Sequence, residues 1–258
     1  MSSLSPSRAE RIAALRAEVR AIESAGSAGE RDCLPFGIEA MDRRLAGGGL
    51  AVPALHEMAG AGPGLGDDAA ATLFIAGIAA RLAMERAGGT VLWALSRRDL
   101  FAPGLAQAGL GPDRILYAEC RNDEEVLAVM EEGLRHGGLA AVIGEIGRVA
   151  MASTRRLQLA SEEGGTAALM LKRWRKAGDD PLVVPSAAVT RWRIGCAPSA
   201  ELPVRGVGRP RWRVELARQR GGEPFTLIME GTDAEGRLAL FAEPRHRSPQ
   251  ADRPRQAA

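Results

Sequence analysis

Hydrophobic and polar positions along the chain follow two periods, which predict strands alternating with helices. Residues 69–86 carry an apolar face at helical spacing, made by Phe74, Ile75, Ile78 and Leu82. Five short apolar runs are typical of buried strands and lie at residues 54–58, 90–95, 115–118, 139–143 and 167–171. Their alternation with helical segments predicts an α/β fold with a mostly parallel twisted sheet flanked by helices.

The pattern changes after residue 171, where short apolar stretches are separated by turns. Strands are expected at residues 189–194, 211–217, 225–230 and 237–241. Gly221-Gly222 and Asp233–Gly236 are hairpin signals between them. The C-terminal side is therefore expected to carry an antiparallel strand extension. Before this point, Asn122 can cap a helix that Gly137 ends.

The first residues predict a separate amphipathic helix, with Ser5 as its cap and Pro6 at its first position. Its apolar stripe consists of Ile12, Leu15, Val19 and Ile22. We expect a helix and linker over residues 1–29, a core domain with C-terminal antiparallel strands over 30–242, and a flexible Arg/Pro-rich tail over 243–258. The stripe fits packing on the chain's own core and an interface with a partner equally well.

Composition narrows the class of protein. The 258 residues are 46% hydrophobic, enough for one sizeable core, yet no run approaches the roughly 18 apolar residues of a membrane span. The start of the chain lacks the apolar segment of a secretion signal, so we expect a soluble cytoplasmic protein. The 3 cysteines and 3 histidines have no metal-ligand spacing, so we expect no metal ion. We also expect no cofactor, because the glycine-rich loop described below lacks a lysine.

The stretch Glu57–Thr72, EMAGAGPGLGDDAAAT, joins a predicted strand to a predicted helix, where nucleotide-binding proteins hold phosphate. A working loop reads G-x-x-x-x-G-K-[ST], because backbone N–H groups and the lysine hold the phosphates while the hydroxyl holds Mg²⁺. The chain's only lysines are Lys172 and Lys176, and neither follows a glycine-rich turn. We predict a degenerate loop, made of Gly60, Gly62, Gly64, Gly66, Asp67 and Asp68.

The two aspartates of this loop argue against a phosphate role. Unit charges of like sign about 4 Å apart repel by about 4 kcal/mol at an effective dielectric near 20, so Asp67 and Asp68 would repel a triphosphate. At the start of a helix, by contrast, each acid is favourable by roughly 0.3–1 kcal/mol. We therefore predict that both are helix-start residues.

Positive charge is concentrated in residues 172–220, which hold twelve Lys and Arg against four acids in a chain of net charge +2. Such a polarised distribution favours a polyanion or an acidic partner. The candidates for contact with single-stranded DNA, through phosphate pairing and base stacking, are Lys172, Arg173, Trp174, Arg175 and Lys176. The alternative is that Trp174, Trp192 and Trp212 are strand or core aromatics and that the arginines are solvated or contact a protein.

Residues 34–50 resemble the entry segment of the RecA superfamily, and weaker matches continue in the same order to about residue 230. The matching positions are Leu34-Pro35, Gly37-Ile38, Met41-Asp42, Leu45 and Gly48-Gly49-Leu50. The resemblance implies a RecA-like core. In that superfamily an aspartate for Mg²⁺ ends the third core strand, and Glu145 stands there without the lysine or the catalytic glutamate.

Within this superfamily the chain resembles the ImuA family, the RecA-like accessory proteins of bacterial damage-inducible mutagenesis cassettes, through its short core, Arg/Trp-rich segments and Arg-rich tail. This implies a non-catalytic adaptor in SOS-induced mutagenic translesion DNA synthesis. Implied partners are ImuB, a Y-family polymerase-like protein, through it a DnaE-type error-prone polymerase, and RecA itself. Expected partner-interface residues are the N-terminal stripe together with Arg209, Arg211, Arg218 and Arg220. A diverged ATP-dependent recombinase and a RecA-fold cell-division inhibitor are the alternatives.

Overall fold

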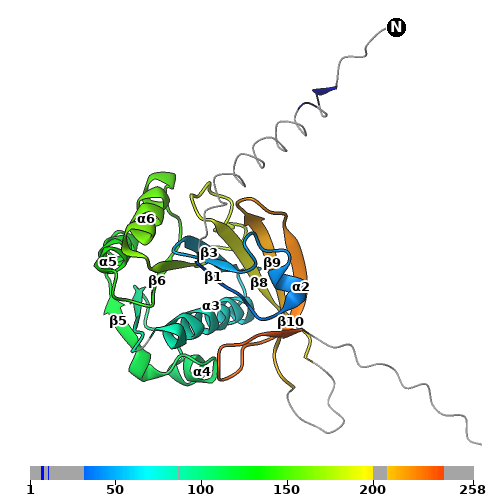
Figure 1. The fold of residues 1–258 in the computed structure, drawn as a ribbon, viewed down its shortest axis with the longest axis horizontal. Coiled ribbons are helices and arrows are strands. Elements are labelled where there is room, and N and C mark those ends of the chain that lie inside the picture. The colour runs from blue at the N-terminus through cyan, green and yellow to red at the C-terminus, as the bar shows by residue number, and fades with distance from the viewer. Residues whose placement is uncertain (1–6, 9–10, 12–31, 87, 200–207, 241–258) are drawn as a thin grey trace, which may run out of the picture.

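The computed structural model describes residues 7–8, 11, 32–86, 88–199 and 208–240, and the expected N-terminal stripe and the C-terminal tail lie outside them. The strands are β1 (Asp32–Leu34), β2 (Leu50–Val52), β3 (Leu55–Gly60), β4 (Val91–Leu95), β5 (Ile115–Glu119), β6 (Ala141–Ile146), β7 (Ala167–Lys172), β8 (Thr190–Ala197), β9 (Arg211–Gln219), β10 (Phe225–Glu230) and β11 (Ala239–Leu240). Nine of them form one sheet in the order β11-β10-β9-β8-β3-β7-β6-β4-β5, and β1 pairs with β2 (Figure 1).

Strand directions in the large sheet confirm the expected fold class. The neighbours from β8 through β3, β7, β6 and β4 to β5 are all parallel. From β8 outward, β9, β10 and β11 pair antiparallel, which is the predicted C-terminal extension. Strands β3, β4, β6 and β7 are buried along their whole length, because helices cover both faces of the sheet.

One long helix, α3 (Leu65–Glu85), covers one face of the sheet, and α5 (Asp123–His136) and α6 (Met151–Gly164) lie side by side on the other (Figure 1). The apolar face predicted for residues 69–86 is buried in α3. The helix starts four residues earlier than predicted, inside the glycine-rich stretch. The Asn122 side chain caps α5 by accepting from the Glu125 N–H at 2.9 Å, and Gly137 ends it at φ 70°.

The entry segment is a folded part of the core. Between β1 and β2 lies the short helix α2 (Glu39–Asp42), and the Asp42 carboxylate accepts hydrogen bonds from the N–H groups of Phe36 at 2.7 Å and Ile38 at 3.0 Å. The Phe36 ring packs against Trp192, with centroids 5.9 Å apart. Trp192 and Trp212 are 0% and 2% exposed, so these two tryptophans are core aromatics.

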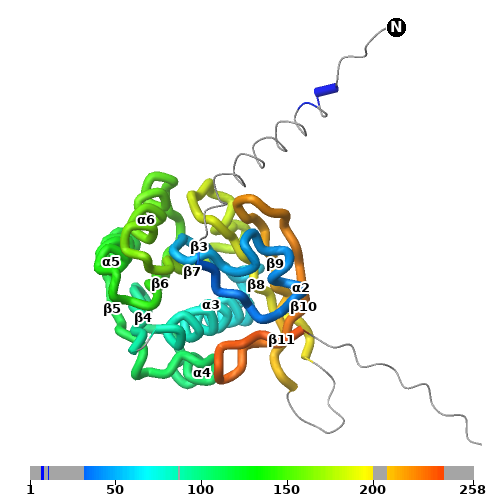
Figure 2. Tube along the Cα trace, viewed as in Figure 1, coloured from blue at the N-terminus to red at the C-terminus, as the bar shows by residue number. Residues whose placement is uncertain are grey.

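Three short segments complete the described structure: a helix, a 3₁₀ turn and the connection between the last two strands. Helix α4 (Ala102–Gln107) follows β4, and the 3₁₀ turn η1 (Pro112–Arg114) leads into β5. The connection between β10 and β11 lies beside α4 and α3 (Figure 2). Thr232 leaves no room for a Cβ at Gly77, and Gly236 leaves none at Gly109. No described helix has both the length and the apolar character needed to cross a membrane.

Candidate functional site: a glycine-rich loop closed by an ion-pair cluster

The glycine-rich loop runs from the end of β3 to the start of α3, at the edge of the sheet where the parallel strands end. A Cβ added to Gly60 would lie 3.0 Å from the carbonyl carbon of Asp67, so a larger residue here would require the loop or the helix to shift by a few tenths of an ångström. The Trp174 indole N–H donates to the Gly60 carbonyl at 2.9 Å. The loop is therefore held on both sides by the chain itself.

The two aspartates lie in the first turn of α3, as predicted, and each makes a tertiary contact as well. Asp67 Oδ1 accepts from the backbone N–H of Cys196 at 2.8 Å, which joins the helix start to β8. Asp68 Oδ2 pairs with the guanidinium of Arg173, which follows β7. Both carboxylates thus tie α3 to neighbouring strands.

Arg173 is the centre of a buried cluster of charges. Its Nε and Nη2 donate to Glu145 Oε2 at 2.9 and 2.8 Å, and its Nη2 lies 3.6 Å from Asp99 Oδ1. Glu145 comes from β6, and its Oε1 accepts from the Trp93 indole N–H of β4 at 2.8 Å. One guanidinium thus faces three carboxylates, from Asp68, Asp99 and Glu145.

Burial and charge shift the pKa values in this cluster. Burial raises the pKa of the Glu145 carboxyl, and the hydrogen bonds from Arg173 and Trp93 oppose that shift without reversing it. Burial alone would lower the pKa of Arg173, but Glu145 and Asp68 together raise it, so the guanidinium stays charged. Desolvated ions of this kind are stable only when they are paired and hydrogen-bonded.

The charged groups at this edge bind one another. The cation beside the glycine-rich loop is Arg173, and its guanidinium is paired with Asp68 and Glu145. Glu145, the one carboxylate that the sequence placed for Mg²⁺, accepts from Arg173 and Trp93. Among the described residues, no group of three or more His, Cys, Asp or Glu is placed to hold a metal ion. The sequence did not identify Arg173 as the internal counter-ion of Asp68 and Glu145. The one sequence signal for this role is that a charged residue directly follows a buried strand.

The five candidates for DNA contact are divided between the core and the surface. Lys172 is 1% exposed, and burial lowers its pKa to about 8. Arg173 is held in the cluster, and Trp174 is half-buried against Gly60. Arg175 and Lys176 are exposed, with Arg175 Nη2 2.6 Å from Asp123 Oδ1. Only these two basic side chains lie where a phosphate can approach.

The four arginines expected at a partner interface do not come together. Arg209 and Arg211 lie at the start of β9, where Arg209 pairs with Glu230 at 3.1 Å. Arg218 and Arg220 lie at its other end and donate to the carbonyls of residues 186 and 187. Arg211 and Arg218 are seven positions apart along the extended strand β9, which separates the two pairs by roughly 23 Å. The four residues therefore form two separate basic spots.

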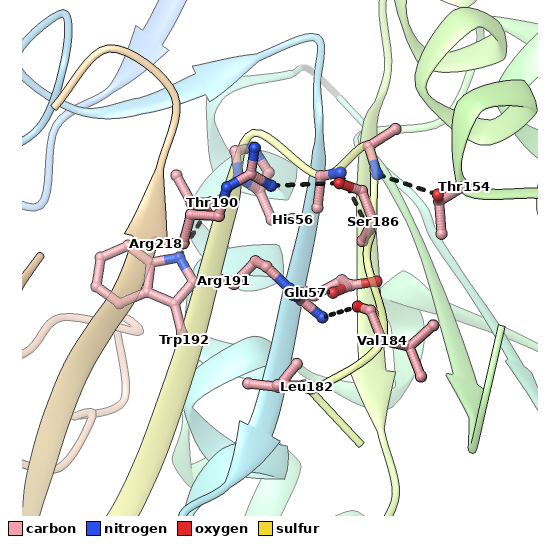
Figure 3. Close-up of polar contacts among 12 residues, drawn as sticks. His56, Glu57, Thr154, Leu182, Val184, Ser186, Thr190, Arg191, Trp192 and Arg218 are labelled. Carbon is pink, nitrogen blue, oxygen red and sulfur yellow. Dashed lines mark hydrogen bonds and ion pairs between the residues drawn. The ribbon is translucent and has the colours of Figure 1, made fainter. Parts of the chain in front are cut away.

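A second buried polar group lies on the central strands β3 and β8 (Figure 3). Trp192 Nε1–H donates to Thr190 Oγ1 at 2.6 Å, and Thr190 Oγ1 lies 2.7 Å from His56 Nδ1. His56 Nε2 lies 2.8 Å from the carbonyl oxygen of Ala51, so this nitrogen carries the proton. Burial lowers the pKa of His56 to about 4, and the neutral ring satisfies this chain of hydrogen bonds.

On the opposite face of β3, Glu57 pairs with Arg191 of β8, with Oε2 and Nε 2.7 Å apart. Arg191 Nη2 also donates to the carbonyl of Val184 at 2.9 Å, which fixes the loop that leads into β8 (Figure 3). The pair is buried, with side chains 1% and 10% exposed. Its role is structural: it holds the loop after β7 against the sheet.

No protein-family model matches the chain. It is 39% identical over 215 residues to Protein ImuA of Caulobacter vibrioides strain NA1000 / CB15N, and equally to Protein ImuA of strain ATCC 19089 / CIP 103742 / CB 15. Each alignment covers 81% of this chain and 88% of the relative. Among solved structures, the crystal structure of SulA from Pseudomonas aeruginosa aligns with 46% of this chain and 96% of its own, at 24% identity and a TM-score of 0.38.

Proposed function

The chain belongs to the ImuA family, and from that membership we propose that it is a non-catalytic adaptor in damage-inducible mutagenic DNA synthesis. In this role it binds partners and does not hydrolyse ATP. The partner we propose is ImuB, the Y-family polymerase-like protein, and through it a DnaE-type polymerase. RecA and single-stranded DNA are further proposed partners.

One observation carries the non-catalytic part of the proposal, the ion-pair cluster of Arg173 with Asp68 and Glu145. A nucleotide would have to break these pairs in order to use Arg173 as its phosphate ligand. Breaking a buried pair leaves uncompensated charges and costs about 3–5 kcal/mol, a factor of roughly one hundred to several thousand in affinity. The described residues offer no lysine in exchange, because Lys172 points its charge into the core and Lys176 lies on the surface.

Calorimetric titration of the full chain with Mg·ATP tests this part directly. We expect no binding in the micromolar range, with a catalytically active RecA protein as the positive control for the assay. Micromolar binding that is lost on replacement of Gly60 by alanine, in a variant whose circular dichroism shows that it is folded, would place a nucleotide in the loop. That result would favour the alternative, a diverged ATPase, and would overturn the adaptor proposal.

Co-purification with ImuB tests the binding part. We propose that residues 30–242 form the core and that residues 243–258 are a separate tail. The informative truncation ends at Leu240, the last described residue, and removes the tail together with the two residues before it. A cut at residue 205 would remove β9 and β10, which carry the core residues Trp212, Val214 and Leu216. If the full chain does not retain ImuB, the proposed partnership is wrong. If the chain cut after Leu240 retains ImuB fully, the interface lies in the rest of the protein.

Of the five candidates for DNA contact, we propose Arg175 and Lys176, because their side chains are exposed. Replacing both by glutamate is expected to weaken binding of single-stranded DNA at low salt and to reduce the salt dependence by about two charges. Arg155 and Arg156, which are exposed on α6, provide the matched double charge reversal. Equal weakening by the two double variants would mean that the effect is one of net charge, and the assignment would be withdrawn.

A further inference from the structure

A pocket of about 330 Å³ opens between the start of α3 and helix α4, next to the ion-pair cluster. Its apolar lining comes from Leu65, Ala69, Leu73, Leu100, Phe101 and Leu105. Its polar lining includes Asp68, Asp99 and Arg173. Two of the apolar residues stand out from the surface, since Leu65 is 89% and Phe101 is 70% exposed. Apolar side chains of this size, exposed around a concave site, mark a surface that binds another molecule.

The charges around this pocket select the kind of molecule. Arg173 is the only cation among the lining residues, and three carboxylates share it, those of Asp68, Asp99 and Glu145. Arg97 also lies near Asp99, with its Nε 3.6 Å from Asp99 Oδ2. Even when Arg97 is counted, two cations face three carboxylates, so the net charge of these side chains is negative. The pocket therefore offers negative charge beside an apolar wall.

We propose that this pocket binds a segment of a protein partner in which a bulky apolar side chain stands next to an arginine or lysine. The apolar side chain would pack among Leu65, Leu73 and Phe101, and the cation would approach Asp68 and Asp99. The volume suits one or two side chains and lies at the lower end of the range for small-ligand sites. The inference rests on the proposed adaptor function, because it requires that the loop beside the pocket holds no triphosphate.

Dipeptide probes test the pocket independently of any natural partner. The full chain, labelled with ¹³C in the leucine methyl groups, is titrated with N-acetyl-Phe-Arg-amide and followed by NMR. We expect saturable shifts at Leu65 and Leu73. N-acetyl-Phe-Glu-amide, which reverses the charge, and N-acetyl-Gly-Arg-amide, which lacks the apolar side chain, are each expected to bind about tenfold more weakly. Absence of shifts at these leucines, or equal binding of all three probes, overturns the proposal.

Variants of surface residues distinguish binding of the probe in the pocket from nonspecific binding elsewhere on the protein. The double variant Leu65→Ala/Phe101→Ala is expected to weaken the Phe-Arg probe about fivefold or more, and Leu159→Ala on α6, a residue that is 57% exposed, is expected to leave it unchanged. Equal affinities in all three proteins overturn the proposal. If ImuB co-purifies while the probes fail to bind, the pocket inference is wrong and the adaptor function stands. If the probes bind and ImuB does not co-purify, the partnership is wrong and the pocket stands.

Discussion

The guanidinium of Arg173 donates two hydrogen bonds to a single oxygen of Glu145, at 2.9 and 2.8 Å, while its third nitrogen pairs with Asp68. The three residues belong to different elements, since Asp68 starts α3, Glu145 lies in β6 and Arg173 follows β7. The arginine thus holds the glycine-rich loop, the sheet and the helix together. The positive charge of Arg173 is therefore used within the fold, where it pairs with the carboxylates of Glu145 and Asp68.

Replacing Arg173 by methionine is expected to destabilise the protein by about 3–5 kcal/mol, because it leaves the carboxylates of Glu145 and Asp68 without a counter-charge. Urea unfolding followed by circular dichroism measures the loss. Arg175→Met is the matched control, because its side chain is 56% exposed and its pair with Asp123 is worth less than about 1 kcal/mol. Similar losses in both variants would show that the cluster contributes no more than a surface pair.

Replacing Gly60 by alanine is expected to destabilise the protein by about 1–3 kcal/mol, because the new Cβ would lie 3.0 Å from the backbone of Asp67. Gly64→Ala, four residues later in the same loop, meets no atom within 4 Å and is expected to change stability by less than about 0.5 kcal/mol. Thermal unfolding of both variants checks this difference. A neutral Gly60→Ala would mean that the loop has room to move away from the helix.

Stability is expected to depend on the protonation of His56. Its pKa is about 4 in the folded protein and 6.5 as the ordinary value, so between these limits the unfolded chain binds more protons. The free energy of unfolding therefore falls as pH decreases from 6.5 to 4, by up to about 1.4 kcal/mol per pH unit from this group.

Urea unfolding at several pH values in this window measures that slope for the natural chain and for His56→Gln, in which the titrating group is gone. The carboxylates contribute to both proteins in the same way, so the difference between the slopes belongs to His56. A variant with an undiminished slope would show that His56 does not titrate in this range.

Replacing Lys172 by methionine is expected to stabilise the protein at pH 7 by about 1–3 kcal/mol. The pKa of Lys172 is about 8 when folded, against 10.5 ordinarily, so keeping it charged opposes folding below pH 8. In the natural chain, stability is expected to rise from pH 8 to 10.5 as this proton is lost, and the variant should lack the rise. Chemical unfolding at pH 7 and pH 10 checks both statements, and a destabilised variant at pH 7 would contradict them.

The sequence predicted the local features of this protein because each depends on neighbouring residues. Continuous apolar runs predicted the fully buried strands β3, β4, β6 and β7, and the turns after residue 171 predicted the antiparallel extension. The run at residues 115–118 was wrongly expected to be buried, because β5 lies at the edge of the sheet and its residues are partly or fully exposed. Asn122 and Gly137 marked the ends of α5 through short-range hydrogen bonding and backbone conformation. The two aspartates of the lysine-free loop were correctly predicted to start α3, whereas the degenerate phosphate site inferred from composition and spacing stays a prediction. Helix α6 was not predicted, because few apolar residues mark its buried side.

Tertiary structure alone decided which charges meet. Arg173 and Asp68 are 105 positions apart in the chain, and Arg173 and Glu145 are 28 apart. They meet because parallel strands end at one edge of the sheet, where α3 also begins. The same packing placed Lys172 in the core and left Arg175 and Lys176 outside, although all three belong to one basic run. Spacing along a chain determines which side of a strand or helix a residue occupies, whereas burial and the partner of a charge depend on how distant elements pack together.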